Sequence, residues 1–194
     1  MPLIEYNGKE PQISPKSYVS PNATLIGDVI VHDDAVIWPS TYIRAENAQI
    51  NIGKYSTIFN GVAMITRTPQ SPINIGGYCI IETGVVIFGC FFEDYVQVLE
   101  GSIIYEGSSL GEGVILLEGS QVPPGLTIEA RSIMKGVPVE KIREQSRKDL
   151  LEVKERAEHY SQLFIKINNQ LPNIQSYVLT LPDFIKIMLD KFKE

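Results

Sequence analysis

The sequence predicts an all-β solenoid, a parallel β-helix of triangular coils, followed by a C-terminal α-helix and a short helical tail. Two observations predict this fold class. An apolar residue recurs at every sixth position through most of the chain, and this period fits neither the 3.6 residues of an α-helix nor the 2 of a flat strand. After Met134 this repeat stops, and apolar residues then follow at alternating spacings of three and four.

The six-residue repeat defines the body of the molecule. Three hexads complete one triangular coil, so residues eighteen positions apart are expected to stack at the inter-strand spacing of about 4.8 Å. This arithmetic gives six to seven coils between the first and last members of the repeat. Its members are Val19, Leu25, Val31, Ile37, Ile43, Ile52, Ile58, Met64, Ile75, Ile81, Ile87, Phe92, Val98, Ile104, Leu110, Leu116, Val122, Ile128 and Met134.

Three interruptions of the repeat predict where the coils depart from regularity. The spacing is nine between Ile43 and Ile52, and five between Ile87 and Phe92. It is eleven across the segment that contains residues 66–72, and two prolines in this segment favour a loop that projects from the body. Each interruption therefore predicts an extruded loop or a tightened corner.

The chain divides into three predicted parts. Residues 1–135 form the β-helix with its N-terminal lead-in, 136–170 a long amphipathic helix packed along the prism, and 171–194 a tail with a short amphipathic helix. The tail helix is expected to contact a partner or a membrane surface, with packing on its own chain as the alternative. Its apolar side consists of Phe184, Ile185, Met188, Leu189 and Phe192.

Composition favours a soluble domain. The 194 residues are 44% hydrophobic and 21% charged, and no apolar stretch has the length of a membrane-spanning helix. A net charge of −6 argues against nucleic acid as a partner, because phosphate binding requires clustered Lys and Arg. Cys79 and Cys90 are too few for a disulfide framework, and the first residues do not resemble a secretory signal.

Several short motifs resemble the γ-class carbonic anhydrases and their homologues. They occur in the order of that family and cover about residues 1 to 168. The resemblance implies a left-handed β-helix and a trimer. The motifs are Ile26-Gly27-Asp28-Val29, Ile37-Trp38-Pro39, Ile43-Arg44, Phe88-Gly89-Cys90, Lys135-Gly136-Val137-Pro138 and Ala157-Glu158-His159-Tyr160-Ser161.

In that family three histidines bind a divalent metal between neighbouring subunits, two from one chain and the third from the next. The resemblance places Ile65, Thr83 and Phe88 at these ligand positions. Ile and Phe carry no lone pair and a Thr hydroxyl is a poor ligand alone, so we expect no metal, no cofactor and no catalytic residue. Phe59 and Asn60 stand where the family usually has Gln and Asp, which makes the expected pocket more apolar.

The resemblance also assigns a trimer contact. Arg44 and Glu46 stand where the family has an arginine and an acid that pair across the trimer interface. Glu can still accept a bidentate Arg contact, so this pair is expected to lie at the interface of the trimer.

The leading functional hypothesis is a structural subunit that is not an enzyme. It would join two other γ-carbonic-anhydrase-like chains in a heterotrimer on the membrane arm of mitochondrial NADH:ubiquinone oxidoreductase (complex I), on the matrix side of the inner membrane. The alternative is a stand-alone, cytoplasmic homotrimer with a scaffold or ligand-binding role. Remoter alternatives are a dynactin-type β-helix subunit and a hexapeptide acyltransferase, for which His32 is the candidate base among the coils.

Overall fold

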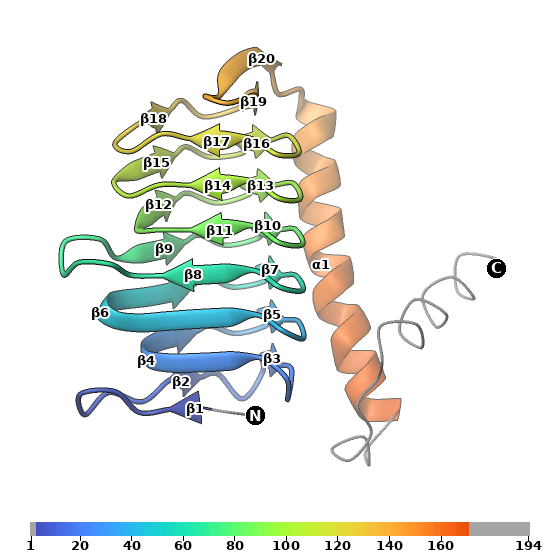
Figure 1. Cartoon of the computed structure of the whole chain (residues 1–194). Helices are drawn as coiled ribbons and strands as arrows, with labels where there is room; N and C mark the ends of the chain where they lie inside the picture. Colours follow the sequence, from blue (N-terminus) through green and yellow to red (C-terminus); the bar gives the residue numbers. More distant parts are fainter. Residues whose placement is uncertain (1–2, 171–194) are drawn as a thin grey trace.

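The computed structural model describes residues 3–170 and confirms the β-helix with a C-terminal helix. About seven parallel coils stack into a three-sided prism, and one long helix runs along its side (Figure 1). The predicted tail helix and its apolar residues, including Phe184 and Met188, lie outside the described residues. The helix that the structure describes is not long and apolar enough to cross a membrane.

The strands form three faces, here called face A, face B and face C. The first parts of β4 (Thr24–Val31) and β6 (Tyr42–Ile52) lie on face A, and their last parts turn onto face B. Face A also contains β1 (Leu3–Ile4), β8 (Ala63–Ile65), β11 (Val86–Ile87), β14 (Ile103–Ile104) and β17 (Gln121–Val122). Face B also contains β2 (Gln12–Ile13), β9 (Ile73–Ile75), β12 (Cys90–Phe92), β15 (Ser108–Leu110) and β18 (Thr127–Ile128). Face C contains β3 (Tyr18–Val19), β5 (Val36–Ile37), β7 (Thr57–Ile58), β10 (Ile80–Ile81), β13 (Gln97–Val98), β16 (Ile115–Leu116) and β19 (Ser132–Lys135).

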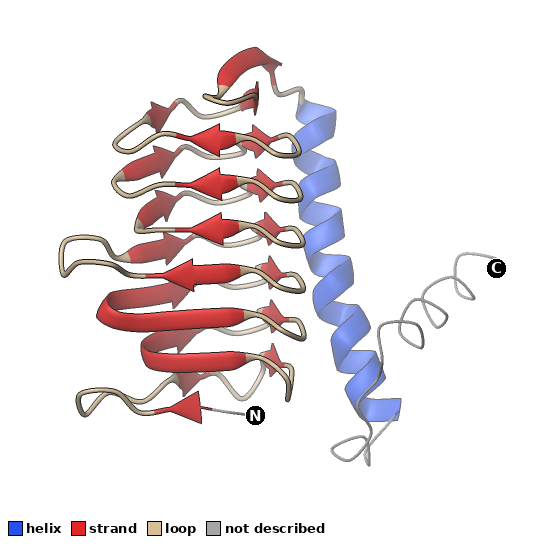
Figure 2. Cartoon of the chain, in the orientation of Figure 1, coloured by secondary structure: helices blue, strands red, loops and turns tan. Residues whose placement is uncertain are grey.

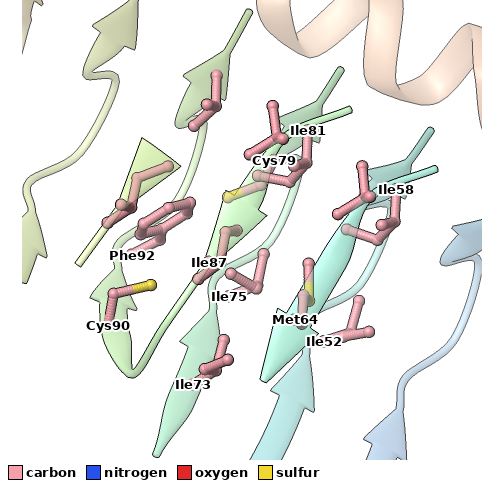
Figure 3. Close-up of a cluster of buried hydrophobic side chains, with 14 of the residues drawn as sticks. Ile52, Ile58, Met64, Ile73, Ile75, Cys79, Ile81, Ile87, Cys90 and Phe92 are labelled. Atoms are coloured by element: carbon pink, nitrogen blue, oxygen red, sulfur yellow. The ribbon is translucent and has the colours of Figure 1, made fainter. Parts of the chain in front are cut away.

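The six-residue repeat forms the interior of the prism, as predicted. On face A, Ile43 pairs with Met64, which pairs with Ile87, which in turn pairs with Ile104. All four side chains are fully buried. Figure 3 shows the inward residues of three faces meeting in one apolar cluster. Because successive side chains of a strand alternate between the two sides of the sheet, the residues that flank this column point outward.

Two interruptions of the repeat change the shape of the corner between faces A and B. The eleven-residue spacing produces the loop between β8 and β9, which projects from the prism (Figure 1). The five-residue spacing produces a tight corner at Gly89, whose φ is 57°. A Cβ atom at Gly89 would lie 2.4 Å from the Cβ of Ser71 in the preceding loop. Glycine is therefore required there by both conformation and space.

The third interruption, of nine residues, does not form a separate loop. The chain continues as the single eleven-residue strand β6, which turns the corner while it stays paired with β4. A register shift next to Gly27 accommodates the extra length.

The C-terminal helix α1 (Arg147–Gln170) begins later than the predicted boundary at 136. Residues of β20 (Glu140–Glu144) instead pair antiparallel with β19 and close the end of the prism. Ser146 and Asp149 then form a reciprocal cap, in which each side chain accepts a hydrogen bond from the other's backbone N–H, at 3.2 Å and 2.7 Å. The helix starts where this cap is complete.

Helix α1 covers face C, as Figure 2 shows. Val153 and Ala157 of α1 are buried against Ile80, Ile115 and Ile133 of the face. The amphipathic stripe predicted from the sequence therefore packs along the prism. This contact occupies face C and leaves faces A and B uncovered by the described residues.

Replacement of Phe92 by Ala should lower the free energy of unfolding by about 3–5 kcal/mol, because its ring is 1% exposed within the column and a cavity would remain. Phe91 is the matched control. It points outward from the same strand and is 50% exposed, so Phe91→Ala should change stability by no more than about 0.5 kcal/mol. Chemical denaturation of both variants checks this, and equal losses would contradict the assigned register.

Candidate functional site at the edges of face A

Two of the three predicted ligand positions meet at the corner between faces A and B, here called the AB corner. Ile65 and Phe88 follow Met64 and Ile87, which pair between neighbouring coils. The Phe88 N–H donates to the carbonyl of Ile104, which continues the same register. Both side chains therefore lie next to each other on the outer side of face A, where each is partly exposed.

Thr83 lies at the opposite edge of face A, at the corner with face C, here called the CA corner. It is exposed, and its carbonyl accepts a hydrogen bond from the Gly101 N–H of the next coil. One chain therefore brings Ile65 and Phe88 together and holds Thr83 apart from them. This split matches the division of ligands between two chains that the resemblance implies.

The donor set of these positions does not fit a zinc or cobalt site. Ile65 and Phe88 offer no lone pair, and Thr83 offers only a neutral hydroxyl. Within residues 3–170, no group of three His, Cys, Asp or Glu side chains is placed to hold a metal ion. A metal at this interface would need ligands from another chain.

Arg67 covers the AB corner, and sequence reasoning missed it. Its guanidinium carbon lies 3.7 Å from the centre of the Phe88 ring, a cation–π geometry. Its Nη1 donates a hydrogen bond of 3.2 Å to Oε1 of Glu106, which lies two coils beyond Arg67 and one coil beyond Phe88. The sequence signal that could have located Arg67 is its place in the loop that projects directly after Ile65.

Arg44 and Glu46, the predicted interface pair, also lie at the AB corner. The Arg44 Nε and the Glu46 Oε2 are 3.4 Å apart within one chain. The Thr66 N–H donates to the Arg44 carbonyl, which ties the pair to the base of the projecting loop. Their contact across a trimer interface remains a prediction.

Phe59 does not line face A. It stacks on Trp38 with ring centres 4.6 Å apart and contacts Tyr160 of α1 edge-on at 5.0 Å. The expectation that Phe59 fills the former pocket is therefore replaced by a packing role beneath the helix. Its position, one residue before the corner residue Asn60, places its side chain on face C.

Glu82 connects the CA corner to the helix. It immediately precedes Thr83, is 9% exposed, and accepts a hydrogen bond of 2.8 Å from Nη2 of Arg156. Burial raises the pKa of the Glu82 carboxyl, and the Arg156 guanidinium opposes this effect. The pair holds α1 against the edge of the candidate site.

His32 and Cys79 lie away from face A, and Cys90, which follows the corner residue Gly89, is buried inside the prism. The His32 Nε2 is 2.8 Å from the Asn51 Oδ1, between faces B and C. Burial raises the pKa of Cys79 to about 12 and that of Cys90 well above its ordinary value. Both thiols therefore stay protonated and act as small core residues (Figure 3).

Face B carries a shallow cavity of about 430 Å³, and two of the three carboxylates that line it accept backbone hydrogen bonds. Oδ1 of Asp94 accepts the Gly77 N–H at 2.7 Å. Oε2 of Glu93 accepts the Glu112 N–H at 2.8 Å. Glu93 and Asp94 stabilise corners of the coils through these hydrogen bonds, so a structural role accounts for both carboxylates.

The fold is that of the hexapeptide-repeat left-handed β-helix proteins. A relative from Methanocaldococcus jannaschii named "Probable carbonic anhydrase" is 32% identical over 151 residues, which cover 78% of this chain and 94% of the relative. The chain therefore belongs to the γ-carbonic-anhydrase-like family of hexapeptide-repeat proteins. No protein-family model matches the sequence.

Two further proteins illustrate the breadth of the similarity. The "Carnitine operon protein CaiE" of Proteus sp. is 26% identical over 184 residues, which cover 94% of this chain and 91% of the relative. A solved structure of a hexapeptide transferase family protein from Anaplasma phagocytophilum is 25% identical with a TM-score of 0.80. The match covers 84% of this chain and 95% of that structure.

These comparisons contradict the prediction that the chain is not an enzyme. Relatives from Geobacillus kaustophilus and M. jannaschii are named carbonic anhydrases. A structure from Bacillus cereus named "putative acetyltransferase" is 25% identical, with a TM-score of 0.74 and coverage of 83% of this chain and 97% of that one. The residues at 65, 83 and 88 were therefore not a sufficient basis for that prediction.

Replacement of Arg156 by Ala should destabilise the protein at pH 7 by about 2 kcal/mol, because it leaves the buried Glu82 carboxylate without its charged partner. A carboxyl whose pKa is higher in the folded than in the unfolded state stabilises the fold at a pH below the unfolded-state pKa. This stabilisation is lost as the pH rises through the folded-state pKa. The loss in this variant should therefore grow between pH 4 and pH 7. Denaturation at both pH values measures it.

Lys148→Ala is the matched control for this experiment. Lys148 lies on the same helix, is 85% exposed and forms an ion pair with the exposed Glu152 at 3.6 Å. It should show little change at either pH. A pH-independent loss in Arg156→Ala would assign the stabilisation to packing of the arginine stem.

Proposed function

We propose that the chain is a subunit of a γ-carbonic-anhydrase-like trimer and that it assembles through face A. The observation that carries this proposal is the apolar character of the outer side of that face. Tyr42, Ala63, Val86 and Ile103 stack in register on four successive coils, and all of them retain exposed surface. Apolar patches of this kind on otherwise polar surfaces mark interaction sites.

The other two faces support this choice by contrast. Face C is already covered by α1. The corresponding outward column of face B is mainly polar, with Asn51, Asn74, Ser109 and Thr127, and Ile30 and Phe91 are its apolar members. Burial of face A against another subunit would remove its apolar surface from water, which is the main favourable term in stable association.

We further propose that the trimer is mixed, and that other chains supply metal-binding histidines at the interfaces. The residues at 65, 83 and 88 support this, because they offer no imidazole to such a site. Enzymatic activity would then belong to the assembled trimer. We propose, more specifically, that this trimer is part of the membrane arm of complex I, on the matrix side of the mitochondrial inner membrane. The alternative is a cytoplasmic homotrimer.

Replacement of Val86 by Asp should weaken association at least about a hundredfold, because it would bury an unpaired carboxylate in the interface. Sedimentation of the assembled protein, alone or together with other family chains, should show the mass of three chains, and the variant should sediment as a single chain. Ser109→Asp on face B is the control and should stay trimeric. A wild type that is monomeric at all concentrations, with or without other family chains, would sink the assembly proposal.

Affinity purification of the tagged chain from its source organism tests the finer proposal. Recovery of two further family chains together with respiratory membrane-arm subunits is the expected result. A Val86→Asp bait is the control, because it should lose these proteins while keeping non-specific ones. Recovery of this chain alone, as a homotrimer, would remove the complex I assignment and leave the assembly proposal intact.

A further inference from the structure

Arg67 is held in a fixed position at the AB corner by contacts within its own chain. The Phe88 ring supports one side of the guanidinium plane, and Glu106 accepts one hydrogen bond through Nη1. The side chain of Arg67 is nevertheless 50% exposed. A long side chain that is already ordered loses less conformational entropy when it binds a partner.

The guanidinium keeps capacity for a second carboxylate. Arginine carries five N–H donors in a planar fork, and the contact with Glu106 uses one of them. Arginine commonly binds a carboxylate through two parallel hydrogen bonds. Arg67 is therefore suited to recognise an acidic group that approaches face A from outside.

The opposite edge of the same face presents such acidic groups. Glu100 and Glu118 are exposed at the CA corner, each just before a glycine with a positive φ, Gly101 and Gly119. Neither glutamate has an ion-pair partner among residues 3–170. The CA corner thus offers unpaired negative charge beside an apolar face.

Glu100 lies on the same coil as Glu106, the hydrogen-bond partner of Arg67, whereas Phe88 lies one coil below and the Arg67 backbone two coils below. It enters face A on the coil whose strand β14 ends just before Glu106, the partner of Arg67. Identical subunits that close a ring through one face must join two different edges of it, because such an interface is heterologous. When the rotation axis is parallel to the prism, equal heights meet, so the end of the Arg67 guanidinium that contacts Glu106 in one subunit faces the coil of Glu100 in the next.

We propose that Arg67 binds Glu100 of a second copy of this chain, and that this contact fixes the register of neighbouring subunits. The proposal rests on assembly through face A in the homotrimeric form given above as the alternative, because a trimer with two other family chains contains no second copy of this chain. In this arrangement Arg67, which is stacked on Phe88, binds the acidic CA corner of the adjoining subunit. The contact would join the two corners at which the ligand positions of this family lie.

The test is a set of charge reversals, with the trimer dissociation measured by sedimentation and native mass spectrometry. Arg67→Glu and Glu100→Arg should each weaken association roughly ten- to a hundredfold, and the double variant should recover most of the loss. Glu129→Arg is the control, because this exposed glutamate follows β18 on face B and should have no effect.

A second pair of variants separates the intersubunit contact from the intrachain one. If Arg67 acts only by holding Glu106, the Glu106→Arg change should rescue Arg67→Glu and Glu100→Arg should not. That outcome overturns the inference. Rescue by Glu118→Arg in place of Glu100→Arg also overturns it, because it contradicts the equal-height register.

Failure of the inference can be told apart from failure of the proposed function. A wild-type trimer that is dissociated by Val86→Asp but is unaffected by every charge reversal refutes the Arg67 contact alone. A pure chain that is monomeric refutes a contact between copies of this chain, whereas association only with other family chains preserves the mixed trimer.

Discussion

The stacking of inward side chains in register is the constraint on which the rest of the structure depends. Each coil places three apolar residues on the corresponding residues of the coil below, as Met64 does on Ile43. Parallel pairing fixes the height of each coil at the inter-strand spacing, so a coil cannot expand inward or along the axis. Extra residues are therefore forced outward at a corner, and missing residues tighten a corner.

This constraint determines where chemistry can occur on the prism. The interior is filled by side chains, and its two thiols stay protonated because burial raises their pKa values. Functional groups must consequently lie on the outer columns or at the corners. The projecting loop carries Arg67 to the same corner as Ile65 and Phe88, so the largest insertion in the repeat modifies the edge of the candidate site.

The sequence was sufficient to predict the repeat, the inward columns and the projecting loop, because each depends on a period that is visible along the chain. It was not sufficient for β20, whose formation depends on pairing with β19 at the end of the prism. It also misplaced Phe59, because a shift of one residue at a corner moves a side chain from face A to face C. The Arg67 contact joins three coils and has no periodic signature.

In the proposed trimer a site would combine residues of two chains, so residue identities in one chain were a poor guide to function. Ile65 and Phe88 lie on one edge of face A and Thr83 on the other, and an interface through face A would therefore combine positions from different subunits. In a mixed trimer, a chain that lacks imidazoles at its own positions still shapes the opposite wall of a neighbour's site. Its contribution would come through groups such as Arg67 and Glu82, which set charge and position at the two corners. Each site of such a trimer would be formed by the AB corner of one subunit and the CA corner of the next, so its function has to be assigned to the interface and not to a single chain.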